Sequence, residues 1–235
     1  LGLITLKGTK SLANIMFILG LLTAAGILYT SYVNTGSTFN AYYAAIIALI
    51  GVLVGYFYTA KPIRLSSRYG LGELSIFLSF GPLLTLGTGF AIANETILLF
   101  SNEFYNLILL GIPIGLLTTN ILFINQYPDY ASDKKVGKNH LVVLLGKKSS
   151  RWIYALNLAL AIGSLYYIAE NILNQTQGSL FLYLLIPISM IYSYYLIAGL
   201  FKHYNSRSLI KYNIHTIYFH MLFSFIYMII LANFQ

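Results

Sequence analysis

The sequence predicts an all-α fold, a polytopic membrane bundle of seven transmembrane helices. Three observations lead to this prediction: few charged residues, seven long apolar stretches, and Lys and Arg residues confined to alternate connections. The 235 residues are 58% hydrophobic and only 9% charged, with a mean hydropathy of +0.74. Soluble domains carry about 25% charged residues, so the surplus apolar surface of this chain is expected to face lipid.

Seven apolar stretches have the length that a helix needs to cross a bilayer, which is about 20 residues. They cover residues 12–33, 39–58, 74–93, 105–124, 152–169, 180–200 and 214–231. Continuous runs of this kind argue against a membrane β-barrel, whose strands are short and alternate in hydropathy. The pair Gly81 and Pro82, and also Pro113, are expected to kink the helices that contain them.

The charges divide cleanly between the two sides of the predicted bundle. All fourteen Lys and Arg residues lie in the N-terminal segment and in the connections 59–73, 125–151 and 201–213. Glu95, Glu103 and Glu170 lie in the other connections. Lys and Arg in short loops stay on the cytoplasmic side. We therefore expect an integral protein of the cell (inner) membrane with its N-terminus inside, a lipid bilayer as its partner, and no nucleic acid despite the net charge of +8.

The two aspartates of the chain, Asp129 and Asp133, lie four residues apart within the connection 125–151. If this segment is helical, Asn125, Asp129 and Asp133 share one face at successive turns. Pro128 lacks an N–H group and is expected to break or kink the helix just before Asp129. The carboxylates would then lie at a helix end near water, on the cytoplasmic side of the membrane.

Two carboxylates and an amide oxygen are the ligands of a hard cation. Mg²⁺ takes one or two carboxylates and completes its shell with water and substrate phosphate. Lys134, Lys135 and Lys138 follow at once, so the cluster is typical of a metal-bridged diphosphate whose other oxygens meet lysines. The alternative from spacing alone is a solvated loop with incidental charge. Acids at a membrane rim favour the functional interpretation.

The connection 59–73 supplies further positive charge on the same side of the membrane. It contains Lys61, Arg64 and Arg68, which are expected to reach a phosphate across a shared cytoplasmic mouth. The alternative is ordinary positive-inside charge with no ligand. The glycines of this connection are too irregular for a phosphate-binding loop.

These two connections together resemble the UbiA family of intramembrane prenyltransferases. Residues 125–146 are similar to the second Asp-rich motif of that family and the segment after it. Residues 55–62, 70–73 and 80–82 resemble the branch that prenylates 1,4-dihydroxy-2-naphthoate in menaquinone synthesis. The order and spacing of these elements match, and the resemblance covers essentially the whole chain.

The resemblance implies a Mg²⁺-dependent enzyme that transfers a polyprenyl group from a prenyl diphosphate to an aromatic acceptor. The acceptor it implies first is 1,4-dihydroxy-2-naphthoate. Other acceptors in the family are 4-hydroxybenzoate, homogentisate, chlorophyllide, haem and glycerol phosphate lipids. Asp129 and Asp133 would bind Mg²⁺, with Asn125 as a further ligand to the metal or the diphosphate.

The resemblance also implies roles for the residues around the acids. Lys138, Lys61 and Arg64 would neutralise the departing diphosphate. Tyr58 would shield the allylic cation through its π face. The match is incomplete, because Pro62 stands where some members have Lys and Leu144 stands where the family often has Arg.

The family has nine helices and two Asp-rich motifs, whereas this sequence has seven predicted helices and one motif. Residues 2–8 resemble the segment just beyond the first motif. We therefore expect helices three to nine of the family fold in a single transmembrane domain, residues 1–235, that is incomplete at its N-terminus. Because half of the metal cage would be missing, this chain is expected to be inactive by itself.

Two other classes of protein compete with the enzyme. A seven-helix transporter or sensor would place its acids near the bilayer midplane, often in broken helices, whereas these aspartates lie at the rim. A structural scaffold would leave the acid pair without a purpose. The histidines show no metal-ligand spacing; His140 is expected to be solvated, while His215 and His220 are expected to be packed or hydrogen-bonded inside the bundle.

Overall fold

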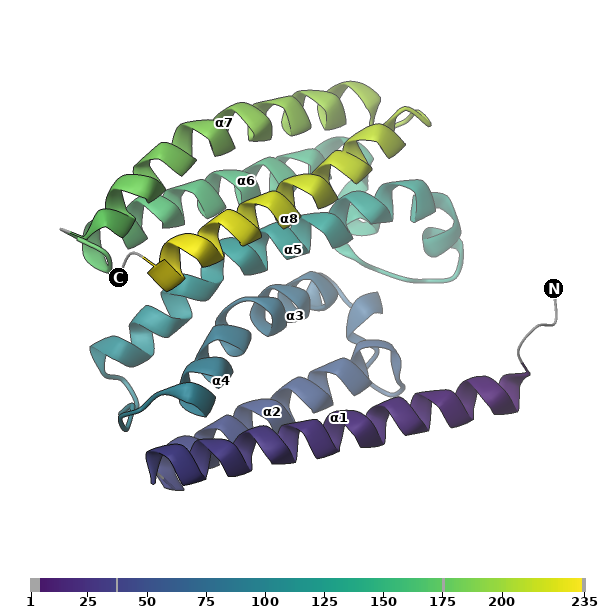
Figure 1. Ribbon diagram of the computed structural model, residues 1–235. Helices are drawn as coiled ribbons and strands as arrows, with labels where there is room; N and C mark the ends of the chain where they lie inside the picture. Colours follow the sequence, from purple (N-terminus) through teal and green to yellow (C-terminus); the bar gives the residue numbers. More distant parts are fainter. Residues whose placement is uncertain (1–4, 37, 175, 234–235) are drawn as a thin grey trace.

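The structure, a computed structural model, describes residues 5–36, 38–174 and 176–233, which form eight α-helices and one 3₁₀ helix (Figure 1). They are α1 (Leu6–Thr35), α2 (Thr38–Thr59), η1 (Leu65–Ser67), α3 (Leu71–Phe80), α4 (Pro82–Ile92), α5 (Asn102–Lys135), α6 (Leu141–Asn171), α7 (Gln177–His203) and α8 (Leu209–Asn233). Because α3 and α4 form one span, these residues hold seven helices long and apolar enough to cross a membrane. The predicted fold class is confirmed. Residues 2–4 of the opening segment lie outside the described residues.

The connections of the bundle fall at two opposite ends. Figure 1 shows the start of α1 and the α2–α3, α5–α6 and α7–α8 connections at one end, with the end of α8 and the α4–α5 connection at the other. The Lys and Arg residues of the described segments lie at the first end, which we call the basic end. The predicted division of charge is thus present in three dimensions.

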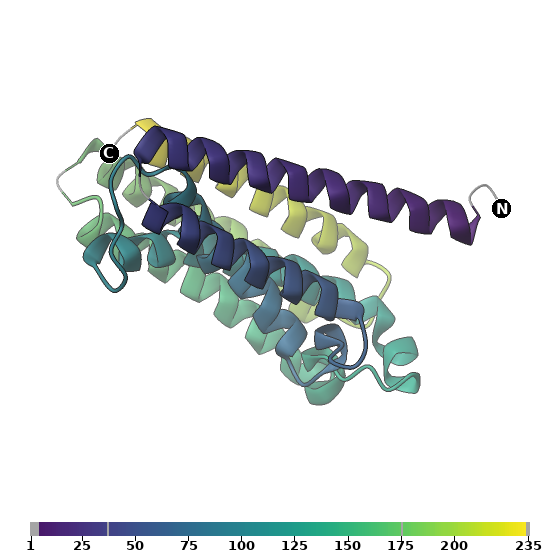
Figure 2. The same cartoon turned by 90° about the horizontal axis from the view of Figure 1, so that it is seen from below.

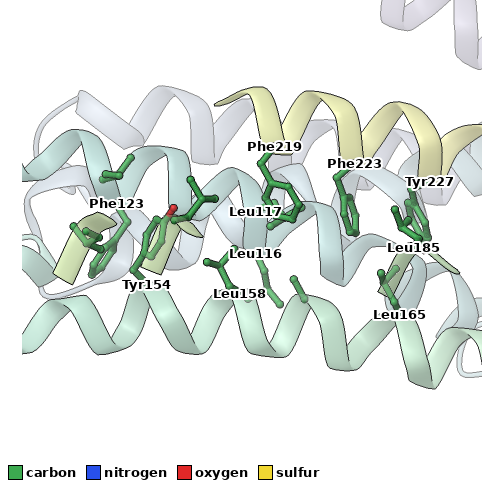
Figure 3. Close-up of a cluster of buried hydrophobic side chains, with 14 of the residues drawn as sticks. Leu116, Leu117, Phe123, Tyr154, Leu158, Leu165, Leu185, Phe219, Phe223 and Tyr227 are labelled. Atoms are coloured by element: carbon green, nitrogen blue, oxygen red, sulfur yellow. The ribbon is translucent and has the colours of Figure 1, made fainter. Parts of the chain in front are cut away.

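The core lies among α5, α6, α7 and α8, which pack against one another in the upper half of Figure 1. Figure 3 shows buried side chains from all four helices filling the space between them. They include Leu116, Leu117, Tyr154, Leu158, Leu165, Leu185, Phe219, Phe223 and Tyr227. A smaller cluster around Phe90 joins α2 and α4. By contrast, the side chains of α1 are mostly exposed, and Figure 2 shows α1 and α2 diverging toward the basic end.

The third span is interrupted between α3 and α4, as the sequence predicts. Gly81 has non-helical backbone angles (φ −117°, ψ −107°), and Pro82 opens α4. The interruption rests on small residues of α5: a Cβ added to Gly111 would lie 2.6 Å from the Gly81 carbonyl oxygen, and one on Gly115 would lie 2.6 Å from the Phe77 oxygen. Small residues four apart allow such close contact between membrane helices.

The expected break at Pro128 is wrong, because α5 continues through this residue to Lys135. Proline removes one N–H donor, but the turn is held by Phe123, Ile124 and Tyr127, whose side chains are fully buried against neighbouring helices. The connection predicted at 125–151 is also mostly helical, since only residues 136–140 separate α5 from α6.

Replacing Gly111 with Val is expected to destabilise the protein by about 1–3 kcal/mol or more, as overpacking does in a close-packed interior. The added side chain would force α5 away from the Gly81 turn. Gly163→Val is the matched control, because a Cβ on Gly163 of α6 meets nothing within 4 Å. The measurement is the thermal unfolding midpoint in detergent micelles; equal midpoints for both variants would contradict the close contact.

Candidate functional site

The predicted acidic residues lie on the last turns of α5 at the basic end. The helix is regular from Asn125 to Asp133, so Asn125, Asp129 and Asp133 occupy successive turns as expected. Asp129 is exposed, and its carboxylate receives no hydrogen bond from the described residues. The side-chain oxygen of Asn125 accepts a hydrogen bond from Asn213 Nδ2 of α8. Asp129 therefore presents an open carboxylate at the membrane rim.

Asp133 is held more firmly than Asp129. Its Oδ2 atom accepts hydrogen bonds from Lys138 Nζ at 3.0 Å and from His140 Nε2 at 3.1 Å. Both partners belong to the short segment after α5, so this segment folds back onto the helix end. Because both contacts use Oδ2, the second oxygen of Asp133 stays available to a ligand.

His140 is buried, with an exposed fraction of 1%, so the expectation that it is solvated is wrong. It caps α6, where its Nδ1 accepts the backbone N–H of Val143. Burial lowers the pKa of His140 below its usual 6.5, and the hydrogen bond with Asp133 offsets this only in part. The ring is therefore neutral at pH 7 and donates from Nε2, which orients the Asp133 carboxylate.

The other two histidines of interest are half-buried on α8, and the expected hydrogen bonds are present. His215 Nδ1 lies 2.9 Å from the Tyr192 hydroxyl, and His220 Nε2 lies 2.9 Å from the Thr118 hydroxyl. Both contacts join α8 to another helix, so these residues have a structural role.

Glu73 is the residue that the sequence analysis missed. It lies in the first turn of α3 and is 4% exposed. Its Oε1 atom accepts hydrogen bonds from Gln126 Nε2 at 3.0 Å and from the backbone N–H of Leu141 at 2.9 Å. This carboxylate therefore joins α3, α5 and α6 beside the acids. The one available signal was an acid directly after a glycine-rich turn in a chain with six acidic residues.

The two basic connections meet at the same end of the bundle. The backbone N–H of Tyr69 donates to the Asn139 carbonyl at 2.8 Å, and the Asn139 N–H donates to the Ser67 carbonyl at 3.1 Å. Gly70 permits this packing, because a Cβ on it would lie 2.9 Å from Leu141 Cδ2. The predicted shared mouth thus has adjoining walls, formed by residues 67–72 and 136–141.

The remaining predicted residues lie at the end of α2 and in the α2–α3 connection. Tyr58 is half-buried and lines a cavity of about 300 Å³ between α2 and α3. Lys61 and Arg64 are exposed, and neither forms an ion pair within the described part of the chain. Lys138 is therefore bonded directly to Asp133. Lys61 and Arg64 follow Tyr58 closely in the sequence and form no ion pair among the described residues.

The two aspartates are suitable ligands for Mg²⁺, but they are too few for a metal site in which every ligand comes from the protein. Among the described residues, no group of three or more His, Asp or Glu residues is arranged to hold an ion. The available ligands are the open Asp129 carboxylate and one oxygen of Asp133. Mg²⁺ is characteristically bound by one or two carboxylates together with water and phosphate, so the residues fit this ion.

Comparison with known proteins points to one family. The profile of the UbiA prenyltransferase family matches residues 2–228. The chain is 31% identical over 122 residues to a 1,4-dihydroxy-2-naphthoate octaprenyltransferase of Bacillus subtilis, covering 52% of the chain and 37% of that relative. It is 28% identical over 184 residues to the protein of the same name in Haemophilus influenzae, covering 78% and 56%.

A third relative, a 2-carboxy-1,4-naphthoquinone phytyltransferase of Synechocystis, is 33% identical over 125 residues, covering 52% of the chain and 37% of the relative. The chain thus spans between about a third and just over half of the length of these relatives. No solved structure matches the chain.

Replacing Glu73 with Ala is expected to leave the Gln126 amide and the Leu141 N–H buried without an acceptor, at a cost of about 1–3 kcal/mol for each group. Glu73→Gln keeps one oxygen acceptor and should lose less. The thermal unfolding midpoint in micelles should be highest for the wild type, lower for Glu73→Gln and lowest for Glu73→Ala. Glu103→Ala, at the opposite end, is the control; a Glu73→Ala midpoint equal to that of the control would rule out the proposed link.

Proposed function

The chain belongs to the UbiA prenyltransferase family, and we propose that this protein transfers a polyprenyl group from a prenyl diphosphate to an aromatic acceptor. The observation that carries the proposal is the acid pair on α5, with Lys138 bonded to it and a second basic connection alongside. The names of three relatives refer to naphthoate or naphthoquinone compounds, which favours 1,4-dihydroxy-2-naphthoate as the acceptor.

In this proposal Asp129 and Asp133 hold Mg²⁺ at the basic end. The ion, when bound, supplies positive charge that stabilises the diphosphate as a leaving group. Asp129 contributes an open carboxylate, and His140 and Lys138 both bond to Oδ2 of Asp133, which leaves Oδ1 for the ion. Glu73 keeps the supporting segments in place, because it fixes the residue after His140 and the residue after Asn125.

The cations of the α2–α3 and α5–α6 connections act on the diphosphate. Lys138 already lies beside the acids, and Lys61 and Arg64 approach from the α2–α3 connection. The bond between the prenyl carbon and the diphosphate oxygen breaks, and its electron pair leaves with the diphosphate. The electron-rich ring of the acceptor then attacks the allylic carbon and becomes aromatic again by releasing a proton or, with a naphthoate acceptor, CO₂. Tyr58 presents its π face to the developing cation from the cavity between α2 and α3.

The membrane explains why this chemistry lies at a helix end. Charged groups are costly in the hydrocarbon core, so the acids and cations remain at the rim while the apolar helix walls accommodate the prenyl tail and exclude water. Lys and Arg of short loops remain in the cytoplasm. The proposed site therefore lies on the cytoplasmic side of the cell membrane, where the soluble diphosphate product is released.

Asp129→Asn and Asp133→Asn are expected to lower the prenylation rate by about 100-fold or more, the scale of loss when a charge-stabilising group is removed from an active site. The assay uses a radiolabelled prenyl diphosphate and membranes from cells that produce the complete gene product. Glu103→Gln, which alters an acid at the opposite end, should keep the wild-type rate. Full turnover in both aspartate variants would refute the assigned role.

Removal of divalent ions should abolish the same activity, because the acids then have no ion through which to hold the diphosphate. Chelation with EDTA is expected to stop turnover and added Mg²⁺ to restore it. The Asp133→Asn variant should need a higher Mg²⁺ concentration for half-maximal rate than the wild type. An EDTA-resistant rate would contradict the metal requirement.

A further inference from the structure

A second cluster of cations lies at the basic end, outside the acid site. It surrounds a cavity of about 260 Å³ between the end of α5, the start of α6 and the α7–α8 connection. Lys147 and Arg207 line this cavity together with the polar residues Asn205 and Ser206. Asn125, Asp129 and Asp133 do not line it. The cavity therefore presents positive charge and hydrogen-bonding groups without an acid in its wall.

The cations of this cluster have no acidic partner in the part of the chain that the structure describes. The ion pairs found there all involve Asp133, and Lys147 and Arg207 take part in none. Lys147 and Lys134 instead share one aromatic ring, with their Nζ atoms 5.6 and 5.7 Å from the centre of Tyr130. Because no acid among the described residues neutralises these two amines, an anion bound beside them would gain a favourable Coulomb interaction.

Arg151 strengthens the positive field behind the cavity and is itself fixed in place. Its guanidinium lies 4.3 Å from the centre of the Tyr204 ring, which lines the cavity, and donates a hydrogen bond to the Phe201 carbonyl at 2.9 Å. Its charge is therefore held near the cavity by packing. The cluster thus combines two cations in the wall with a third, immobilised one nearby.

The side chains around the cavity favour one kind of anion. Trp152 is exposed and packs edge-on against Phe201, 4.8 Å away between ring centres. Exposed Trp side chains mark the level of the lipid headgroups. Leu209 and Ile210 add apolar surface to the same wall, and Ile210 is 58% exposed. A ligand here meets cations at its head and apolar side chains at its tail.

We propose that this cavity binds the phosphate of an anionic phospholipid from the leaflet at the basic end. Basic cavities between transmembrane helices bind such headgroups in other membrane proteins. The phosphate accepts hydrogen bonds from Lys147 and Arg207, and Asn205 and Ser206 bind the remaining polar atoms of the headgroup. The lipid then bridges α6 and the α7–α8 connection. This inference does not depend on the proposed enzymatic function.

Trp152 allows a direct test, because it is the single tryptophan of the chain and follows Arg151, whose guanidinium contacts the Tyr204 ring of the cavity. The purified chain is reconstituted with brominated phosphatidylglycerol or brominated phosphatidylcholine, and quenching of Trp152 fluorescence gives the relative affinity of the two lipids. The wild type should prefer phosphatidylglycerol severalfold. Equal quenching by both lipids would overturn the proposal.

Variants separate the cavity from the general surface charge. Lys147→Gln and Arg207→Gln should each lower the preference for phosphatidylglycerol about fivefold, as expected for one basic residue near an anionic lipid. Lys148→Gln with Lys202→Gln removes two exposed cations at the same end that do not line the cavity, and should change it less than twofold. If the double variant lost as much preference for phosphatidylglycerol as the cavity variants, the preference would arise from general surface charge, and the proposed site would be contradicted.

A soluble anion provides the remaining arm of the experiment. Inorganic phosphate or diphosphate, with and without Mg²⁺, should not displace the brominated lipid at millimolar concentration. Displacement by diphosphate would assign the cavity to a soluble ligand and overturn the lipid proposal. Arg207 lies in the α7–α8 connection, so Arg207→Gln is expected to keep the wild-type thermal midpoint; Arg207→Lys should retain the lipid preference, which distinguishes lost binding from lost folding.

Discussion

The arrangement of the basic end depends on one buried carboxylate, that of Glu73. Burying a polar group is costly unless it is hydrogen-bonded, and the Oε1 atom of Glu73 accepts from Gln126 of α5 and from the first residue of α6, whereas its Oε2 atom is buried without a partner among the described residues. The same two bonds fix the helix that carries the acids and the segment that carries His140 and Lys138. The position of Asp133 is therefore set from the other half of the bundle.

The bilayer determines where apolar and charged side chains lie in the bundle. Apolar side chains fill the core among α5–α8, and glycines on α5 let the interrupted third span approach closely. Ionised groups cannot be placed at this depth cheaply, so they gather where the helices end. Two neighbouring acids are retained there with different constraints: Asp133 is held by Lys138 and His140, whereas Asp129 is open.

The positive charge of the same end is divided between two clusters. Lys138 lies with the acids, and the α2–α3 connection adjoins it through the backbone contacts of Asn139. Lys147 and Arg207 lie around a separate cavity. Cations are already needed at this end to orient the protein in the membrane. We propose that they also bind two kinds of phosphate ligand, the diphosphate group of the substrate and a lipid headgroup.

The sequence by itself determined the seven spans, the side on which the cations lie and the acid pair on one helix face, because run length, loop charge and helical spacing are local properties. It did not reveal the burial of His140, the role of Glu73, the cavity lined by Lys147 and Arg207, or the passage of α5 through Pro128. Glu73 reaches partners 53 and 68 residues away. Only packing decides such contacts, since it sets which distant side chains share a dry interior and which stay open to a ligand.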